Sequence, residues 1–310
     1  MRKVKIGIIG CGGIAKQKHL PSLKADPRAE LVAFCDLIEE RAQWAAGEYG
    51  AEGAKVYTDY HELLKDPEIE VVHVLTPNRS HCELTCDALH AGKHVMCEKP
   101  MAKTYADAKK MLEAAHETGK KLTIGYQHRQ KAESQYVKAC IERGDLGEIY
   151  YAKAYAIRRR GTPNWGVFLN EYEQGGGPLI DIGTHSLDLT LYLMNNYKPR
   201  MVVGTRYKKV ENPECGNPWG GWGKDENTTL EDAAFGFIVM ENGATITLEA
   251  TWALNTDEPI PEGSCRLCGS KAGASIRPNQ VIINKGEFGR LEEIRPDMSA
   301  GGVAFYDGVK

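Results

Sequence analysis

The stretch Ile6-Gly7-Ile8-Ile9-Gly10-Cys11-Gly12-Gly13-Ile14-Ala15 decides the fold that we expect for this chain. It matches the pattern Gly-x-Gly-x-x-Ala, directly after an apolar run typical of a buried strand and directly before a helical pattern. Gly10 allows a tight turn, Gly12 lets the backbone approach a phosphate, and Ala15 permits close packing between helix and strand. Because a helix N-terminus attracts anions, the sequence predicts a dinucleotide-binding loop that includes Gly10, Gly12, Gly13 and Ile14.

Asp36 supports this interpretation, because it ends the second apolar run about 20 residues after the glycine loop. A carboxylate at that point can bind the hydroxyls of the adenosine ribose, and it repels the 2′-phosphate of NADP. The next residues are Leu37 and Ile38, although Arg41 lies close in sequence. We therefore expect NAD as the cofactor, with NADP less favoured. The alternative is a plain glycine turn followed by a helix-capping aspartate.

The first 125 residues alternate short apolar runs with helical patterns, which predicts a doubly wound parallel sheet of the Rossmann type. The runs are rich in Val and Ile, as strands buried on both faces should be. The expected strands are Val4–Ile9, Leu31–Cys35, Val71–Leu75, His94–Cys97 and Leu122–Gly125, and the expected helices are Ile14–Lys24, Glu39–Tyr49, His81–Ala91 and Tyr105–Glu117.

After Gly125 the pattern changes to long strand-like stretches, and Glu241-Asn242-Gly243 is typical of a hairpin turn. We therefore expect residues 1–125 to form the NAD-binding domain and residues 126–310 to form an α+β domain for substrate binding and oligomerisation. Its large sheet should be mostly antiparallel. The expected strands are Ile149–Arg158, Met201–Val210, Ala233–Met240, Thr245–Leu254, Ser264–Leu267 and Val281–Asn284, with helices at Ala132–Arg143 and His185–Met194.

The composition excludes several classes of protein. The 39 Lys and Arg residues nearly balance the 42 Asp and Glu residues and form no basic tract, so nucleic acid is not an expected partner. No apolar run approaches the ~18 residues of a membrane helix. The nine cysteines are odd in number, which favours reduced thiols and a cytoplasmic location. Cys265 and Cys268 have half of a zinc spacing without a second pair, so we expect no metal.

Two polar motifs follow neighbouring strands of the predicted parallel sheet. Thr76-Pro77-Asn78 comes after one strand and Glu98-Lys99-Pro100 after the next. Ligands of open α/β sheets bind beyond the carboxyl ends of the strands, so both motifs should lie beside the cofactor. The alternative for Glu98 and Lys99 is an ordinary surface ion pair in front of a helix.

A glycine-rich segment in the second half carries the third motif, Gly175-Gly-Gly-Pro-Leu-Ile-Asp181-Ile-Gly-Thr-His185. Three consecutive glycines allow the backbone to pass close to a ligand. If a helix begins here, Asp181 and His185 lie on one face, and a carboxylate beside an imidazole suits a histidine that accepts a proton from an alcohol. A structural aspartate–histidine pair is the alternative.

Together these motifs resemble the glucose-fructose oxidoreductase, inositol dehydrogenase and rhizopine catabolism family (Gfo/Idh/MocA), over nearly the whole chain. The resemblance implies that Lys99 polarises the reacting oxygen, Asp181 orients the substrate and His185 is the general base, as the catalytic residues. It implies that Thr76, Asn78, Glu98 and Lys99 line the nicotinamide site. Members usually carry C-terminal helices after the sheet, whereas this chain stops at Lys310, so truncation is one interpretation.

The resemblance implies an NAD-dependent oxidoreductase acting on a secondary hydroxyl of a sugar, inositol or related polyol, assembled as a homodimer or homotetramer. An NAD-assisted glycoside hydrolase and a non-catalytic dinucleotide sensor are the alternatives. His128, Arg129 and Trp165 are candidate substrate contacts, each of which could instead have a structural role. Trp219 and Trp222 lie in a loop that could serve as a lid or as a subunit contact.

Overall fold

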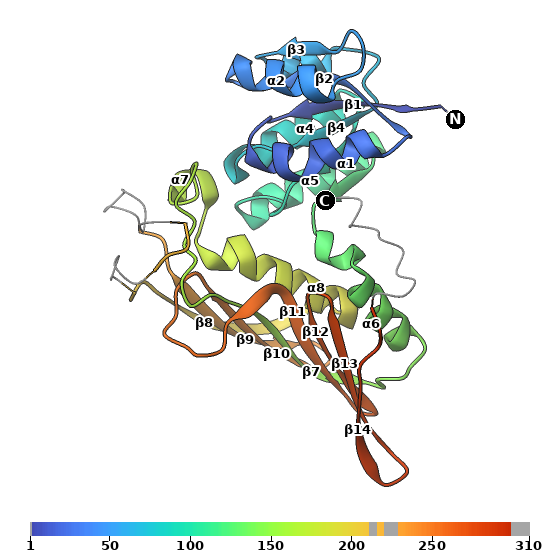
Figure 1. The fold of residues 1–310 in the computed structure, drawn as a ribbon, viewed down its shortest axis with the longest axis vertical. Helices are drawn as coiled ribbons and strands as arrows, with labels where there is room; N and C mark the ends of the chain where they lie inside the picture. The colour runs from blue at the N-terminus through green and yellow to red at the C-terminus, as the bar shows by residue number, and fades with distance from the viewer. Residues whose placement is uncertain (1, 211–215, 220–228, 299–310) are drawn as a thin grey trace. The chain divides into compact units, whose positions relative to one another are not determined.

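The computed structural model describes residues 2–210, 216–219 and 229–298 (Figure 1). Contacts divide the chain into two compact units, with the boundary between Gly125 and Tyr126. No described helix combines the length and the apolar character that crossing a membrane requires. Most of the predicted loop around Trp222 lies outside the described residues, whereas Trp219 lies within them.

The first unit contains a six-stranded sheet in the order β3-β2-β1-β4-β5-β6, with every neighbouring pair parallel. The predicted Rossmann sheet is therefore confirmed. The sequence analysis missed the short strand β3. The strands are β1 (Val4–Ile9), β2 (Ala29–Cys35), β3 (Lys55–Tyr57), β4 (Val71–Val74), β5 (His94–Cys97) and β6 (Leu122–Ile124).

Helices cover both faces of this sheet, as a doubly wound fold requires. Successive residues of β1 point to opposite faces, so Ile8 joins one apolar cluster and Ile9 the other. The first predicted helix begins as a π-helical turn, η1 (Ala15–His19), and continues as α1. The other helices are α1 (Leu20–Ala25), α2 (Glu39–Tyr49), α3 (Tyr60–Leu64), η2 (Asn78–Ser80), α4 (His81–His90) and α5 (Tyr105–Thr118).

The second unit contains an eight-stranded sheet in the order β14-β13-β12-β11-β7-β10-β9-β8. The sheet is antiparallel except for the pair β7 and β10, so the predicted mostly antiparallel sheet is confirmed. The sequence analysis missed β12 and β14. The strands are β7 (Ile149–Ile157), β8 (Pro199–Tyr207), β9 (Ala233–Met240), β10 (Thr245–Thr251), β11 (Ile260–Gly269), β12 (Ala272–Arg277), β13 (Gln280–Glu287) and β14 (Arg290–Ile294).

Two helices cover one face of this sheet and build the core of the second unit (Figure 1). Val137 and Cys140 of one helix and Leu189 and Leu193 of the other pack against alternate residues of the strands. The opposite face leaves large apolar side chains of β8 and β9 exposed. The helices of this unit are η3 (Gln127–Gln130), α6 (Ala132–Glu142), α7 (Glu171–Gln174), η4 (Leu179–Gly183) and α8 (Thr184–Met194).

Candidate active site

The glycine loop joins β1 to η1 at the point where the strand order of the first sheet reverses. Gly10 has a φ of 93°, and a Cβ there would lie 2.8 Å from the carbonyl carbon of Leu75 at the end of β4. Gly12 and Gly13 differ, because a Cβ at either position would meet no protein atom within 4 Å. Gly10 is thus required by the packing of the loop, while the other two leave room for a ligand to approach the backbone.

Asp36 is bound to the glycine loop. One carboxylate oxygen accepts a hydrogen bond from the N–H of Cys11 at 2.8 Å, and the other accepts one from the N–H of Ile38 at 2.9 Å. A carboxylate oxygen has more than one acceptor site, so these bonds leave acceptor capacity for ribose hydroxyls. Because β2 ends at Cys35, Asp36 lies directly after the strand, as the sequence predicts.

The loops after β4 and β5 are held together by His81. Its Nε2 lies 2.9 Å from the carbonyl oxygen of Thr76, and its Nδ1 lies 2.8 Å from the carbonyl oxygen of Pro100. Burial lowers the pKa of His81. Because His81 contacts the main chain of both loops, it fixes the segment containing Thr76 and Asn78 against the segment containing Lys99.

Glu98 anchors Lys99 from the other side. One oxygen of Glu98 accepts from the N–H of Lys99 at 2.9 Å, and the other accepts from His19 Nε2 at 2.8 Å. Burial raises the pKa of Glu98, but the hydrogen bond from His19 and the charges of His19 and Lys99 outweigh it, so the pKa lies below its ordinary value. His73 lies behind His19, with 3.3 Å between their Nδ1 atoms, and burial lowers its pKa to about 3.

In the second unit, Asp181 lies in the π-helical turn η4 and His185 in the first turn of α8. Asp181 Oδ2 accepts a hydrogen bond from Trp252 Nε1 at 2.9 Å, a contact that the sequence analysis did not foresee. His185 is 3% exposed. The pairing of Asp181 with His185 stays a prediction.

The glycine run before η4 has a packing role. Gly177 donates its N–H to Glu231 Oε1 at 2.9 Å, and a Cβ on Gly177 would lie 2.3 Å from the carbonyl oxygen of Glu231. A Cβ on Gly183 would lie 2.7 Å from that of Ala250. The glycines therefore allow η4 to approach its neighbouring segments, which positions Asp181 whether or not a ligand is near.

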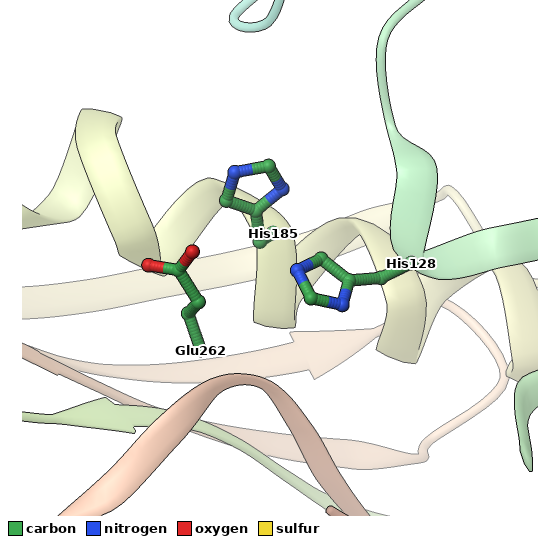
Figure 2. Close-up of side chains that lie close together, drawn as sticks. All are labelled: His128, His185 and Glu262. Carbon is green, nitrogen blue, oxygen red and sulfur yellow. The ribbon is translucent and has the colours of Figure 1, made fainter. Parts of the chain in front are cut away.

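His128, His185 and Glu262 converge in the second unit, from η3, α8 and β11 (Figure 2). Each offers one nitrogen or oxygen atom, and these three atoms lie within 4.8 Å of one another. The His128 and His185 rings meet edge to face, with 4.9 Å between their centroids. The sequence analysis predicted His128 and His185 as site residues but missed Glu262.

A bulge in β11 explains the position of Glu262. The pairing of β11 with β7 shifts between Ile260 and Ser264, and bulges of this kind redirect side chains near active sites. Gly263 has a φ of 73°, and a Cβ there would lie 2.1 Å from His128 Nδ1. The expected strand begins only at Ser264, whereas β11 begins at Ile260, so the sequence pattern gives no signal for Glu262.

Two other predicted substrate contacts have partners within the second unit. Arg129 forms a two-pronged ion pair with Asp188, one bond of which is 2.8 Å long. This hydrogen bond raises the pKa of Arg129, so the guanidinium stays charged. Trp165 is 47% exposed and packs edge to face against Trp219, at 4.9 Å between centroids. The exposed ring of Trp165 remains available to an external ligand.

The predicted site residues thus form one group in each unit. The glycine loop, Asp36 and the loops carrying Thr76, Asn78, Glu98 and Lys99 belong to the first unit. His128, Arg129, Trp165, Asp181 and His185 belong to the second.

Comparison with known families identifies both units. Residues 4–126 match an oxidoreductase family with an NAD-binding Rossmann fold, and residues 134–275 match the Gfo/Idh/MocA C-terminal domain. This chain belongs to the Gfo/Idh/MocA oxidoreductase family. The predicted family, the class of enzyme and NAD as the cofactor are therefore confirmed.

The sequence similarity of this chain to several relatives extends over most of its length. D-glucoside 3-dehydrogenase of Escherichia coli is 39% identical over 92% of this chain and 80% of the relative. Inositol 2-dehydrogenase of Salmonella typhimurium is 39% identical over 88% of this chain and 74% of the relative. The crystal structure of aldose-aldose oxidoreductase from Caulobacter crescentus, complexed with glycerol, has a TM-score of 0.77 and 26% identity, covering 99% of this chain and 88% of that one.

Alanine substitutions at Gly10 and Gly12 should separate packing from ligand binding. Gly10→Ala forces a side chain into a left-handed conformation against Leu75, and we expect the free energy of unfolding without cofactor to fall by about 1–3 kcal/mol. Gly12→Ala meets no protein atom, so it should keep its stability but bind NAD about tenfold more weakly, equal to about 1.4 kcal/mol. Thermal melts and NAD titrations measure both effects. Equal loss of stability in the two variants would contradict this assignment.

Proposed function

We propose that this chain is an NAD-dependent dehydrogenase that transfers a hydride between a secondary hydroxyl of a sugar, inositol or related polyol and the nicotinamide. The observation that carries the proposal is the space left open at the glycine loop, where the strand order of the first sheet reverses. The chain is also 39% identical to a glucoside dehydrogenase and to an inositol dehydrogenase. Sugars carry several secondary hydroxyls, and a buried histidine beside further polar groups can bind one and remove its proton.

The residues of the first unit fit NAD. A Cβ at Gly12 or Gly13 would occupy space that the protein leaves open, and the start of η1 offers N–H groups to a pyrophosphate. Asp36 would bind the adenosine ribose, while Thr76, Asn78, Glu98 and Lys99 would line the nicotinamide site. When bound, NAD supplies the hydride acceptor at C4 of its nicotinamide.

The catalytic residues act on one hydroxyl of the substrate. His185 accepts its proton, and Lys99 stabilises the developing alkoxide with its ammonium charge. Asp181, held by Trp252, orients the substrate.

Other residues of the second unit would shape the binding of the sugar. We place His128 at the hydroxyls next to the reacting one, because its ring contacts that of His185. The exposed face of Trp165 would cover the apolar side of the sugar ring. The ion pair with Asp188 favours a structural role for Arg129, fixing η3 against α8.

Substitution of the base and of the lysine tests this mechanism. A general base contributes about 10²–10⁴-fold, so His185→Ala should lower kcat by that factor while NAD binding stays nearly unchanged. Lys99→Ala should be at least as severe, and Lys99→Arg should not restore activity, because a planar guanidinium differs in shape from a compact ammonium. The measurement is NADH formation over a panel of glycosides, sugars and inositols. Near-normal turnover in both alanine variants would refute the mechanism.

The same assay separates the two alternative functions. A dehydrogenase accumulates NADH in proportion to oxidised polyol. A redox-assisted glycoside hydrolase releases the free sugar without net NADH, and a dinucleotide sensor does neither.

The preference for NAD over NADP depends on the charge of Asp36. The carboxylate would repel a 2′-phosphate, so the unmodified protein should bind NAD more tightly. We expect Asp36→Ala and Asp36→Asn to narrow the gap, with the asparagine retaining an acceptor for the N–H of Cys11. Titration of the cofactor-free protein with both dinucleotides measures the ratio of the two Kd values. Tighter NADP binding by the unmodified protein would overturn the assignment.

The open face of the second sheet is proposed as a subunit interface. Val203 of β8 pairs with Phe237 of β9, and their side chains are 58% and 44% exposed. Because side chains alternate along a strand and Ile238 faces the helices, Val203 and Phe237 point away from the core. A second copy of the chain would cover this face.

Light scattering tests the proposed interface. The unmodified protein should have a mass of a dimer or tetramer, above the 34.3 kDa of one chain. Val203→Glu should lower that mass, because it places a charge in the interface, whereas Leu291→Glu on the exposed edge strand β14 should not. A monomeric unmodified protein at micromolar concentration would contradict the proposal.

A further inference from the structure

We propose that His128, His185 and Glu262 form a binding site for one divalent transition-metal ion such as Zn²⁺, and that the bound ion inhibits the enzyme by occupying His185. The inhibitory part rests on the function proposed above, in which His185 accepts a proton. The binding part rests only on the second unit, whose three candidate ligand atoms lie within 4.8 Å of one another.

The three groups are the ligands that such ions prefer. Two imidazole nitrogens and one carboxylate oxygen are a frequent set for Zn²⁺, with bond lengths of about 2.0–2.2 Å. Ligand atoms around a tetrahedral ion lie closer together than 4.8 Å, so binding requires a small inward movement. Glu262 has the most room for this movement, because its side chain is 36% exposed, whereas His128 and His185 are buried.

The surrounding backbone holds the two histidines in place. The ring of His128 packs against Gly263, where even a Cβ would collide with it. Ser186, which follows His185, accepts from the N–H of Gly263 at 3.2 Å and donates to the carbonyl oxygen of Tyr155 at 3.0 Å. The bulge of β11 and the first turn of α8 are thereby joined, and metal sites depend on ligands that are oriented in this way.

Arg158 supports the carboxylate and also limits the affinity. Its Nη2 donates to Glu262 Oε2 at 3.0 Å, and it donates to the carbonyl oxygen of Gly161 at 2.9 Å. Ligating carboxylates are themselves commonly hydrogen-bonded, and one carboxylate can accept from Arg158 while its other lone pairs bind an ion. The positive charge of Arg158 repels a cation, which favours a reversible site over a permanent one.

Binding of an ion would block the proposed reaction directly. A metal-bound imidazole nitrogen has committed its lone pair, so that nitrogen cannot accept the proton of the substrate hydroxyl. The ion would also occupy the space beside His128 where the sugar is proposed to bind. Inhibition should therefore be relieved by a chelator and by high polyol concentration.

Metal titration of the full-length, untagged and chelator-treated protein tests the binding part without substrate. We expect Co²⁺ to produce its visible absorption bands at one ion per chain and Zn²⁺ to displace it. Glu262→Gln and His128→Ala should each weaken Zn²⁺ binding at least about tenfold. The glutamine can still accept from Arg158. Glu258→Gln is the matched control, because Glu258 is an exposed residue paired with Arg277.

Two outcomes would overturn the proposal. One is the absence of saturable metal binding, and the other is binding that Glu262→Gln and His128→Ala leave unchanged, which would place the ion elsewhere, for example at the free cysteines. Circular dichroism and thermal melts check that each variant is folded. NADH formation by the metal-free protein tests the proposed function separately, so a failed dehydrogenase assay and a failed metal site are distinguishable. Zn²⁺ that binds at this site without slowing turnover would overturn the inhibitory part.

Discussion

The close contact of Gly10 with the end of β4 is the constraint on which the cofactor site depends. With no Cβ, this residue turns the chain at a φ of 93° while the carbonyl carbon of Leu75 lies where a side chain would be. The contact places the loop between β1 and β4, where the strand order of the sheet reverses. Asp36 then binds the N–H of Cys11, and His81 joins the next two loops. The polar residues at the strand ends are thus fixed by backbone contacts before any ligand arrives.

Close backbone packing organises the second unit in a similar way. Gly177 and Gly183 let η4 lie against Glu231 and Ala250, and Gly263 lets β11 lie against His128. Because these glycines have no side chain, neighbouring segments can approach closely. The polar groups of the site lie beside these close contacts. Burying a histidine beside a carboxylate costs free energy unless both groups are paired. Contacts with the surrounding backbone hold this arrangement in place.

The sequence predicted what local patterns determine. Strand–helix alternation gave the parallel sheet, and the glycine pattern located the loop at the end of β1. It missed β3, because three residues are too few for a recognisable pattern. It missed Trp252 as the partner of Asp181, 71 positions away, and Glu262, which belongs to no motif. Those contacts depend on strand pairing between distant segments, which no local pattern specifies. Conversely, the sequence analysis interpreted the glycines at 175–177 as ligand contacts, whereas in the structure Gly177 is needed for close packing.

The most direct test of the proposed chemistry follows the transferred hydrogen itself. A polyol that the enzyme oxidises would be prepared with deuterium on the carbon that carries the reacting hydroxyl, and incubated with NAD. The account predicts that each turnover places one deuterium at C4 of the nicotinamide, detected by mass spectrometry of the NADH, and yields the matching ketone. NADH without deuterium, or a cleaved sugar with no deuterated NADH released, would contradict the account.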